Sequence, residues 1–498
     1  MKRKRIFASL LCIAVIFNLT ACSANNNVDE VTNDETQTIA ASSENTDAVS
    51  TDAASTDVAG AEEGSTPKYV FLFIGDGMSY PQFQAASDYL GAMADEDYMG
   101  ALPSLSYDDR TSTLDGPVEL NFMDFEVAGS TSYETITEKV HEQLGWKVGI
   151  ISSVNLNHAT PAAFYAHQAS RNDYYEIGLE LVESDFEYFA GGGLKKPTGN
   201  EGDQESSYDL ATAVGYKVTY TQDEANAVTA ADGKVVLIDE HLEDSDAMKY
   251  EIDREDSEWA LADYVTKGIE VLDNEEGFFM MCEGGKIDWA CHANDATSTV
   301  LDTLAFADAV QVAIDFAKEH PEETLILVTG DHETGGLTIG FAGTDYDTYL
   351  TNLSNQNISF QQFDDEYIAA YKENGTSFED AMLDVEKLFG LKMTGEEDDK
   401  LVLTEYEIER LKTAYEVAVS EEEVEYDQEQ YVLYGTYNPF SVTITHILNN
   451  KSGIDFTSYS HTGLPVGVFA DGVGAEEFSG YYDNTDIYNK VAALIGVN

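Results

Sequence analysis

The chain has 498 residues, of which 43% are hydrophobic, so it can bury a sizeable core in one large domain or in two to three smaller ones. It carries 93 acidic residues against 26 basic ones, a formal net charge of −67. A body this acidic repels nucleic acid and anionic lipid headgroups, which excludes both as partners bound through charge. A substrate anion would therefore need a local positive site.

The first residues predict an export signal that takes no part in the fold. Residues 2–5 are all basic, and the apolar run over 6–19 is too short to span a membrane. Residues 19–22, Leu-Thr-Ala-Cys, resemble a bacterial lipobox, which implies cleavage before Cys22 and attachment of lipid to its thiol. We therefore expect a signal peptide over 1–21 and an exported protein, lipid-anchored on the outer face of the cell membrane. The alternative is an ordinary cleaved signal with an incidental cysteine.

The segment over 22–66 predicts a disordered tether. It consists mainly of Asn, Thr, Ser, Ala, Asp and Glu and has no aromatic residue. Such a composition cannot bury enough apolar surface to offset the entropy that folding costs. We therefore expect the folded domain to occupy 67–498.

Five continuous apolar runs predict buried strands. Runs without alternation are typical of strands that are covered on both faces, as in a parallel sheet. They are 69–74, 147–152, 235–238, 278–282 and 324–329. Helical patterns lie between them, at 134–144, 256–272 and 297–318. This alternation predicts an α/β fold with a doubly wound, mainly parallel central sheet flanked by helices.

The pattern changes after residue 340. The segment 346–442 is acidic, rich in tyrosine and helical in period. It separates Asp331 and His332 from His461. We expect an inserted helical cap subdomain at about 342–445, whose amphipathic helices pack against one another.

Four separated clusters of acids and histidines point to chemistry. Three of them follow predicted strands, where a sheet of this type collects its ligands. The clusters are Asp76 between two glycines, Glu283 with Asp288 and His292, the pair Asp331-His332, and His461. Taken singly, each is also typical of a solvated loop. Together they predict one multinuclear metal site and metal-assisted chemistry on a charged ester, a phosphate ester above all.

Five sequence blocks resemble the signatures of alkaline phosphatases, in the order that the family has them. The resemblance covers about 67 to the C-terminus and implies a phosphate monoester hydrolase. In this family the phosphoryl group passes in line to a serine before hydrolysis. The blocks are Phe73-Ile-Gly-Asp-Gly-Met78, His158-Ala-Thr-Pro-Ala-Ala163, Glu283-Gly-Gly-Lys-Ile-Asp288 with His292, Thr329-Gly-Asp-His-Glu-Thr-Gly-Gly336 and Ser460-His-Thr-Gly463.

The resemblance also implies two zinc ions and one magnesium ion. The first zinc would be held by Asp288, His292 and His461, the second by Asp76, Asp331 and His332, and the magnesium by Asp76, His158, Thr160 and Glu283. His158 stands where the family commonly has Asp, which leaves the identity of the third ion open. Arg171 follows Thr160 at the spacing of the family's phosphate-clamping arginine; the alternative is a surface arginine.

The ligand types agree with this assignment. Neutral imidazole and carboxylate suit zinc, whereas hydroxyl and carboxylate suit magnesium. The positive charge of three divalent ions would exceed the negative charge of four carboxylates. Arg171 would add a planar guanidinium group that can bind two phosphate oxygens. The result would be a cationic pocket within an acidic protein.

The nucleophile is not identified. The family carries it in an Asp-Ser-Ala block between the blocks of Asp76 and His158, and this chain has no such block there. The family pattern runs to 129–133 and then continues directly with the helix predicted from 134. Three explanations remain open: a shortened version of a normal enzyme, a pseudoenzyme that still binds metal, or substitution by Ser130, Thr131 or Ser132.

Other hydrolase and transferase signatures are absent. The chain has no Cys/Ser-x-Pro-x-Arg sulfatase block, no Gly-x-Ser-x-Gly and no phosphate-binding Gly-x4-Gly-Lys-Ser/Thr. The alternative from another class is a hydrolytically inactive surface lipoprotein that binds metal or phosphate. We expect phosphate monoesters as ligands, a membrane reached through the lipid anchor only, and no nucleic acid. A homodimer is one assembly to test. Cys282 and Cys291 are expected as buried thiols, with a disulfide as the alternative.

Overall fold

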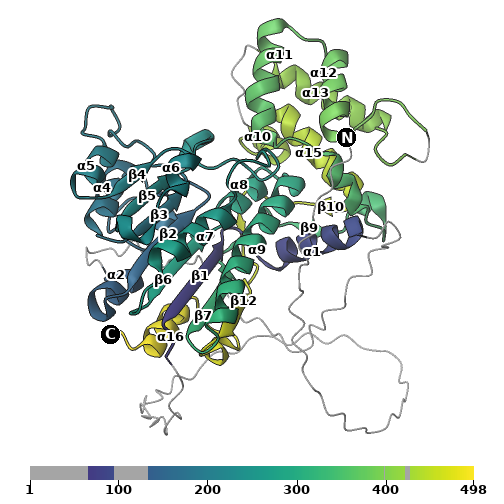
Figure 1. Ribbon diagram of the computed structural model, residues 1–498. Coiled ribbons are helices and arrows are strands. Elements are labelled where there is room, and N and C mark those ends of the chain that lie inside the picture. Colours follow the sequence, from purple (N-terminus) through teal and green to yellow (C-terminus); the bar gives the residue numbers. More distant parts are fainter. Residues whose placement is uncertain (1–65, 95–132, 397–398, 421–426) are drawn as a thin grey trace, which may run out of the picture. The chain divides into compact units, whose positions relative to one another are not determined.

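An eight-stranded sheet forms the centre of the protein. The computed structural model describes residues 66–94, 133–396, 399–420 and 427–498. The strand order is β12-β7-β1-β6-β2-β3-β5-β4 (Figure 1). The bounds are β1 (Tyr69–Gly75), β2 (Lys147–Ser152), β3 (Tyr188–Gly191), β4 (Lys217–Thr219), β5 (Val235–Ile238), β6 (Phe278–Glu283), β7 (Thr324–Gly330) and β12 (Val468–Gly472). Every pairing is parallel except that of β12 with β7, which confirms the predicted fold class.

Helices cover both faces of this sheet. They are α2 (Ile136–Lys139), α3 (Ala159–Ala162), α4 (Tyr174–Glu183), α5 (Ser207–Ala213), α6 (Gln222–Asn226), α7 (Leu261–Leu272), α9 (Ala296–Glu319) and α16 (Thr485–Ile495). Alternate side chains of β1 enter different cores. Val70 packs with residues of α2, α4 and α16, whereas Phe71 packs with residues of α7 and α9. The absence of alternation in this strand therefore reflects burial on both faces.

The five predicted strands are confirmed, and three further strands of this eight-stranded sheet were not predicted. β3 and β4 have four and three residues, too short for a recognisable period. β12 lies at the edge of the sheet and is largely exposed, so its sequence lacks a continuous apolar run. Because β12 pairs antiparallel, it needs no crossover helix before it, so the strand–helix alternation of the sequence did not indicate it either.

The helix predicted from 256 begins five residues later, at Leu261. Ala260 is in an extended conformation, and its N–H donates to the Asp263 carboxylate over 2.8 Å. This hydrogen bond between the first turn and the residue before it sets the start of the helix at Leu261. The helix predicted from 134 likewise begins after Thr135, which forms a capping box with Glu138.

A second group of helices occupies the segment predicted as an insertion. They are α10 (Phe360–Phe363), α11 (Ala369–Asn374), α12 (Phe378–Phe389), α13 (Glu405–Ala418), α14 (Gln428–Tyr434) and α15 (Pro439–Ser452) (Figure 1). Phe363, Phe389, Leu411 and Ile444 give this group its own core. The same core includes residues of α9 and of α1 (Tyr80–Ala94), which join the helices to the sheet layer.

Several predictions concern residues outside the described ranges. The predicted signal peptide, Cys22 and nearly all of the tether lie there, as do Ser130, Thr131 and Ser132. Within the described part of the chain, no helix combines the length and apolar content that a membrane span needs.

The ends of β1 and β7 approach each other closely. Met78 closes a turn after β1 by donating its N–H to the carbonyl of Gly75 over 3.1 Å. A Cβ atom at Gly330, the last residue of β7, would lie 2.0 Å from the carbonyl oxygen of Met78. Glycine is therefore required at this contact, which brings residue 76 next to residue 331.

We predict that Gly330→Ala lowers the free energy of unfolding by about 2–3 kcal/mol, because the new methyl group overpacks a contact between two backbones. Gly463→Ala is the matched control, since a Cβ there would meet no atom within 4 Å. Urea unfolding of both variants measures the difference. Equal effects of the two substitutions would contradict this explanation.

Candidate active site

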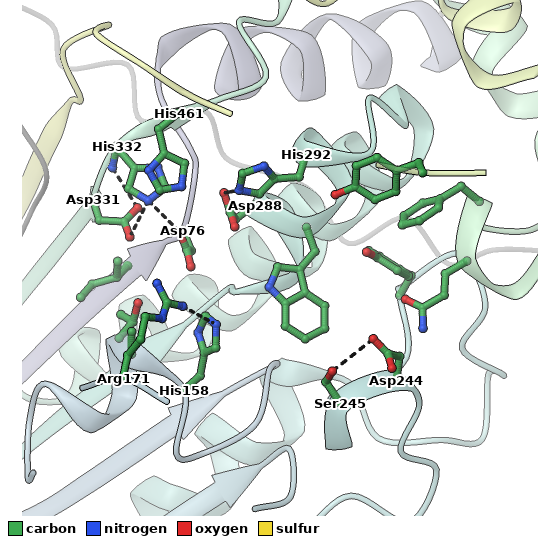
Figure 2. Close-up of a pocket in the computed structure, with 18 of the residues that line it drawn as sticks. Asp76, His158, Arg171, Asp244, Ser245, Asp288, His292, Asp331, His332 and His461 are labelled. Atoms are coloured by element: carbon green, nitrogen blue, oxygen red, sulfur yellow. Dashed lines mark hydrogen bonds and ion pairs between the residues drawn. The ribbon is translucent and has the colours of Figure 1, made fainter. Parts of the chain in front are cut away.

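One cavity of about 830 Å³ gathers nearly all of the predicted site residues. It lies at the carboxyl ends of β1 and β7, where Asp76 and Asp331 follow their strands (Figure 2). The predicted residues that line it are Asp76, His158, Thr160, Arg171, Asp288, His292, Asp331, His332 and His461. Glu283 lies behind this wall and is fully buried.

The register of the sheet sets Asp76 and Asp331 at one height and Glu283 two residues before them. β1 pairs with β6 so that Ile74 lies beside Glu283, and with β7 so that Gly75 lies beside Gly330. Asp76 and Asp331 are the next residues on their strands. The N–H of Gly77 donates to Asp331 Oδ1 over 3.0 Å, which connects the two turns.

A short helix supplies the next two side chains. α8 (Lys286–His292) places Asp288 and His292 one turn apart, with 3.3 Å between Oδ1 and Nε2. His292 Nδ1 donates to the carbonyl of Tyr459 over 2.7 Å. This bond directs the unprotonated Nε2 toward the cavity, the arrangement that metal-ligating histidines adopt.

A pair of two-residue strands brings in His461 from the far end of the chain. β11 (His461–Thr462) pairs antiparallel with β8 (Glu333–Thr334). The rings of His461 and His332 are stacked with their centroids 3.5 Å apart. The hydroxyl of Thr334 donates to Asp288 Oδ1 over 2.6 Å and lies 3.1 Å from His332 Nδ1. The sequence did not indicate this role of Thr334, because a hydroxyl has no recognisable ligand spacing.

Three groups of these side chains have ligand atoms within 4.8 Å of one another. The groups are Asp288 with His332 and His461, Asp76 with His158 and Glu283, and Asp76 with Asp331 and His332. The second group contains three of the four residues predicted for magnesium, and the third consists of the three residues predicted for the second zinc. The first differs from the predicted set because His332 takes the place of His292. The ring of His332 stacks on that of His461, so His332 belongs both to the group of Asp288 and His461 and to the group of Asp76 and Asp331.

Burial concentrates negative charge at this edge. Burial first, and then the charges of Asp331, Asp288 and Glu283, raise the pKa of Asp76 well above its usual value. Burial also raises the pKa of Glu283 to about 7, although hydrogen bonds from Ser152 and Thr160 oppose the shift. Such a cluster of carboxylates is costly unless cations or protons compensate it.

Three buried ligand atoms have no hydrogen-bond partner. They are Asp76 Oδ1, His158 Nδ1 and Glu283 Oε1. All three residues belong to one of the groups above, and buried polar atoms are seldom left unpaired. Burial first, and then the charge of Arg171, lower the pKa of His158 to about 3. Two unpaired carboxylate oxygens fit a divalent cation, to which a neutral imidazole can add the lone pair of the nitrogen that carries no proton.

Arg171 lies at the wall of the cavity beside His158. Its Nη2 donates to His158 Nε2 over 2.9 Å, and Figure 2 shows the guanidinium group between His158 and Asp76. Arg171 is the only lysine or arginine among the described residues that line the cavity. A planar fork at this place can bind two oxygens of an anion.

Asn294 connects the helix that carries His292 to the segment that carries His461. Its Nδ2 donates to the carbonyls of Cys291 and Ser458, each over 2.9 Å. Its own Oδ1 accepts from His446 Nε2 over 3.1 Å. Asn294 has a φ of 54°, a region in which asparagine is enriched. The sequence did not indicate the place of His446 in this network, because this histidine has no ligand spacing.

The remaining histidines and the cysteines are not members of the ligand groups among the described residues. His141, His167, His241 and His320 each face an acidic side chain. Cys282 and Cys291 are buried and free, so the structure follows the expectation of two thiols.

Comparison with known proteins agrees with the family resemblance and with the fold. The family model for alkaline phosphatase matches residues 123–497. Alkaline phosphatase 3 of Bacillus subtilis (strain 168) is 30% identical over 375 residues, which cover 73% of this chain and 71% of that protein. The chain belongs to the alkaline phosphatase family.

Two further comparisons cover more of the chain. Alkaline phosphatase 4 of Bacillus subtilis (strain 168) is 28% identical over 458 residues, 86% of this chain and 88% of that protein. The crystal structure of the cold-active alkaline phosphatase from a psychrophilic Shewanella species has a TM-score of 0.64 at 24% identity. It covers 86% of this chain and 99% of that one, and shows the same fold.

The described part of the cavity lining contains no serine beside the ligand groups; Ser152, which donates a hydrogen bond to Glu283, is buried and does not line the cavity. Among the described residues that line the cavity, the only serine is Ser245. Figure 2 shows it next to Asp244, on the side of the cavity away from Asp76 and Asp331. The residues considered as substitutes, Ser130, Thr131 and Ser132, lie inside the family match but outside the described ranges.

We predict that His446 makes folding sensitive to acid. Burial first, and then Arg410, lower its pKa from 6.5 to about 4. The unfolded chain therefore gains a proton near pH 6.5 and the folded chain only near pH 4, so stability falls as the pH falls through this window. His446→Gln removes this contribution. Urea unfolding at pH 7 and pH 4 should show a smaller decline in the variant than in the wild type, and parallel declines would contradict the assignment.

Proposed function

We propose that this protein is a metal-dependent phosphate monoester hydrolase of the alkaline phosphatase type, which releases inorganic phosphate outside the cytoplasm. One observation carries the proposal. Three groups of metal-ligand side chains, with unpaired buried atoms of Asp76, His158 and Glu283, share one cavity with Arg171. Family membership supports the reaction class.

The ligand set that we propose is the one that the family resemblance implies. Two zinc ions would be held by Asp288, His292 and His461 and by Asp76, Asp331 and His332; one magnesium ion would be held by Asp76, His158, Thr160 and Glu283. We retain His292 beside His461 because its Nε2 lies 3.3 Å from Asp288 Oδ1. His332 is close enough to serve either zinc. Bound divalent ions supply positive charge that polarises the phosphoryl oxygens and favours attack at phosphorus.

Three side chains of the protein would position the ligands and the substrate. The His292–Tyr459 bond holds the imidazole in the tautomer that leaves Nε2 available. The depressed pKa of His158 keeps that ring neutral and able to accept from Arg171 or bind a cation. The Arg171 guanidinium would orient two phosphate oxygens, and the strand ends hold the carboxylates rigidly.

The nucleophile separates this proposal from its alternative. Ser130, Thr131 or Ser132 would have to take the role that the missing Asp-Ser-Ala block has in the family. If none of them does, the chain is a surface lipoprotein that binds metal or phosphate without hydrolysis. We further propose the signal peptide over 1–21, lipidation of Cys22, the tether over 22–66 and a domain over 67–498 with its cap at about 342–445.

The central experiment is hydrolysis of nitrophenyl phosphate at alkaline pH with added zinc and magnesium. We expect release of nitrophenol, and a loss of kcat/KM of about 10³-fold in Asp331→Ala, the order that several kcal/mol of lost charge stabilisation produces. Asp209→Ala, which removes an exposed carboxylate on α5, is the control. No turnover by the wild type at any metal loading would instead support the binding protein.

A second prediction concerns metal binding alone. Because cations relieve the repulsion among buried carboxylates, zinc and magnesium should raise the melting temperature by several degrees. At a metal concentration about 1,000 times Kd the stabilisation is about 4 kcal/mol. The shift should be reversed by a chelator and reduced in Asp288→Asn. A melting temperature that does not respond to metal would contradict the ligand assignment, whether or not the protein is an enzyme.

A further inference from the structure

Glu333 is a fully buried carboxylate that lies outside the ligand groups. It follows His332 on the chain, but it does not line the cavity, and it belongs to none of the three groups of ligand atoms found among the described residues. A buried carboxylate is costly unless hydrogen bonds satisfy its oxygens. The partners of Glu333 therefore indicate what this charge contributes to the structure.

Both oxygens of Glu333 accept hydrogen bonds from neutral donors. Oε1 accepts from the N–H of Leu337 over 3.1 Å and from Gln82 Nε2 over 2.8 Å. Oε2 accepts from the N–H of Gly336 over 3.1 Å and from the hydroxyl of Thr462. The two backbone bonds close the turn that follows β8. The two side-chain bonds reach α1 and β11, which lie 251 and 129 residues away along the chain.

The ladder between β8 and β11 divides its side chains between two faces. His461 lies opposite Thr334, and Thr462 lies opposite Glu333. Successive side chains of a strand point to opposite faces. On one face, His461 stacks on the ring of His332 and Thr334 bonds to a ligand carboxylate (Figure 2). Thr462 and Glu333 therefore bond to each other on the face behind the ligands.

β11 needs this support because it is short and exposed. It consists of two residues, and a two-stranded ladder of that length is marginal by itself. His461 is exposed, as are Gly463 and Leu464 after it. A ligand on such a strand keeps its orientation only if its neighbours are fixed by other contacts.

Two side-chain hydrogen bonds attach the residues that follow His461 to the start of α1. The first runs from Thr462 to Glu333, which in turn accepts from Gln82. The second runs from the Ser79 hydroxyl to the carbonyl of residue 465 over 2.7 Å. The N–H of Ser79 donates to Gln82 Oε1 over 2.9 Å, so both attachments lead to the same turn of α1.

We propose that Glu333 is a positioning residue for the zinc group of His461, on which it acts through the hydroxyl of Thr462. This inference rests on the proposed function, since it concerns a zinc ion that His461 would help to hold. The bond from Thr462 fixes β11, and the fixed strand holds the adjacent His461 against His332.

The same geometry predicts that the other zinc group does not depend on this bond. The segment after His332 is held separately, because the N–H of Thr334 donates to the carbonyl of Gly77 over 3.1 Å. Gly77 also donates its N–H to Asp331 over 3.0 Å. Neither bond involves β11. Loss of the Thr462 hydroxyl should therefore release His461 and leave the group of Asp76, Asp331 and His332 in place.

The test removes only that hydroxyl. Thr462→Val keeps the branched shape of the side chain and leaves Glu333 with its other donors. Zinc affinity is measured on the metal-free full chain, with magnesium present, by competition with a chromophoric chelator. His461→Ala identifies the zinc that this histidine holds. We expect Thr462→Val to weaken that zinc about 10- to 100-fold, the range for loss of a group that orients a metal ligand, and to leave the other zinc unchanged.

Two further variants test the path through the hydroxyl. Thr462→Ser retains the O–H and should restore the wild-type affinity. Thr457→Val makes the same substitution at an exposed residue of the preceding loop, whose hydroxyl donates to the carbonyl of Gly336 over 3.4 Å, and should keep the wild-type affinity. General destabilisation would weaken both zinc sites, so the selective loss of one distinguishes a positioning role from a structural one.

The outcomes separate this inference from the proposed function. Wild-type affinity in Thr462→Val, or an equal loss in Thr462→Ser, would overturn the role of the hydroxyl and leave the metal site standing. An equal loss in Thr457→Val would overturn it too, because the effect would then belong to the whole segment. Failure of the wild type to bind zinc would overturn the proposed ligand set and, with it, this inference. Hydrolysis of esters is not measured, so an inactive chain would not affect the comparison.

Discussion

The repulsion among carboxylates at the edge of the sheet is the constraint on which the rest of the site depends. Parallel pairing of β1 with both β6 and β7 brings the strand ends that carry Asp76, Glu283 and Asp331 to the same edge of the sheet. Burial leaves Asp76 and Glu283 with raised pKa values and unpaired oxygens. A slip of one residue between these strands would turn the carboxylates toward different faces of the sheet, so the observed register is what brings them together. The fold therefore includes an electrostatic repulsion among these carboxylates that bound cations can relieve.

The supporting contacts hold ligand side chains from distant segments in fixed orientations. Tyr459 fixes the His292 ring from the loop before His461, Thr334 connects Asp288 to His332, and Asn294 joins both regions. Hydrogen bonds of this kind set the orientation of a metal ligand. Because these ligands can hold cations, an acidic chain can still bind an anion. The long-range field repels it, whereas the short-range field within the cavity would be positive once cations occupy the ligand groups.

Local patterns predicted the sheet because five of its strands are buried on both faces and so have continuous apolar sequences. Short or exposed strands gave no such signal, as β3, β4 and β12 show. The site shows the same division. Acids and histidines that follow strands were recognisable, as was the one-turn spacing of Asp288 and His292. The role of Asn294 was not recognisable, because its partners Ser458 and His446 lie more than 150 residues away.

The sequence by itself determined the fold class, the family resemblance and the residues able to bind metal, because these depend on local composition and on short sequence motifs. Only the tertiary structure decided which ligands share a group, and it placed His332 as well as His292 beside Asp288 and His461. Only the tertiary structure also brought Thr462 to Glu333. Both results depend on strand register and helix packing, which set distances between residues that local sequence cannot encode.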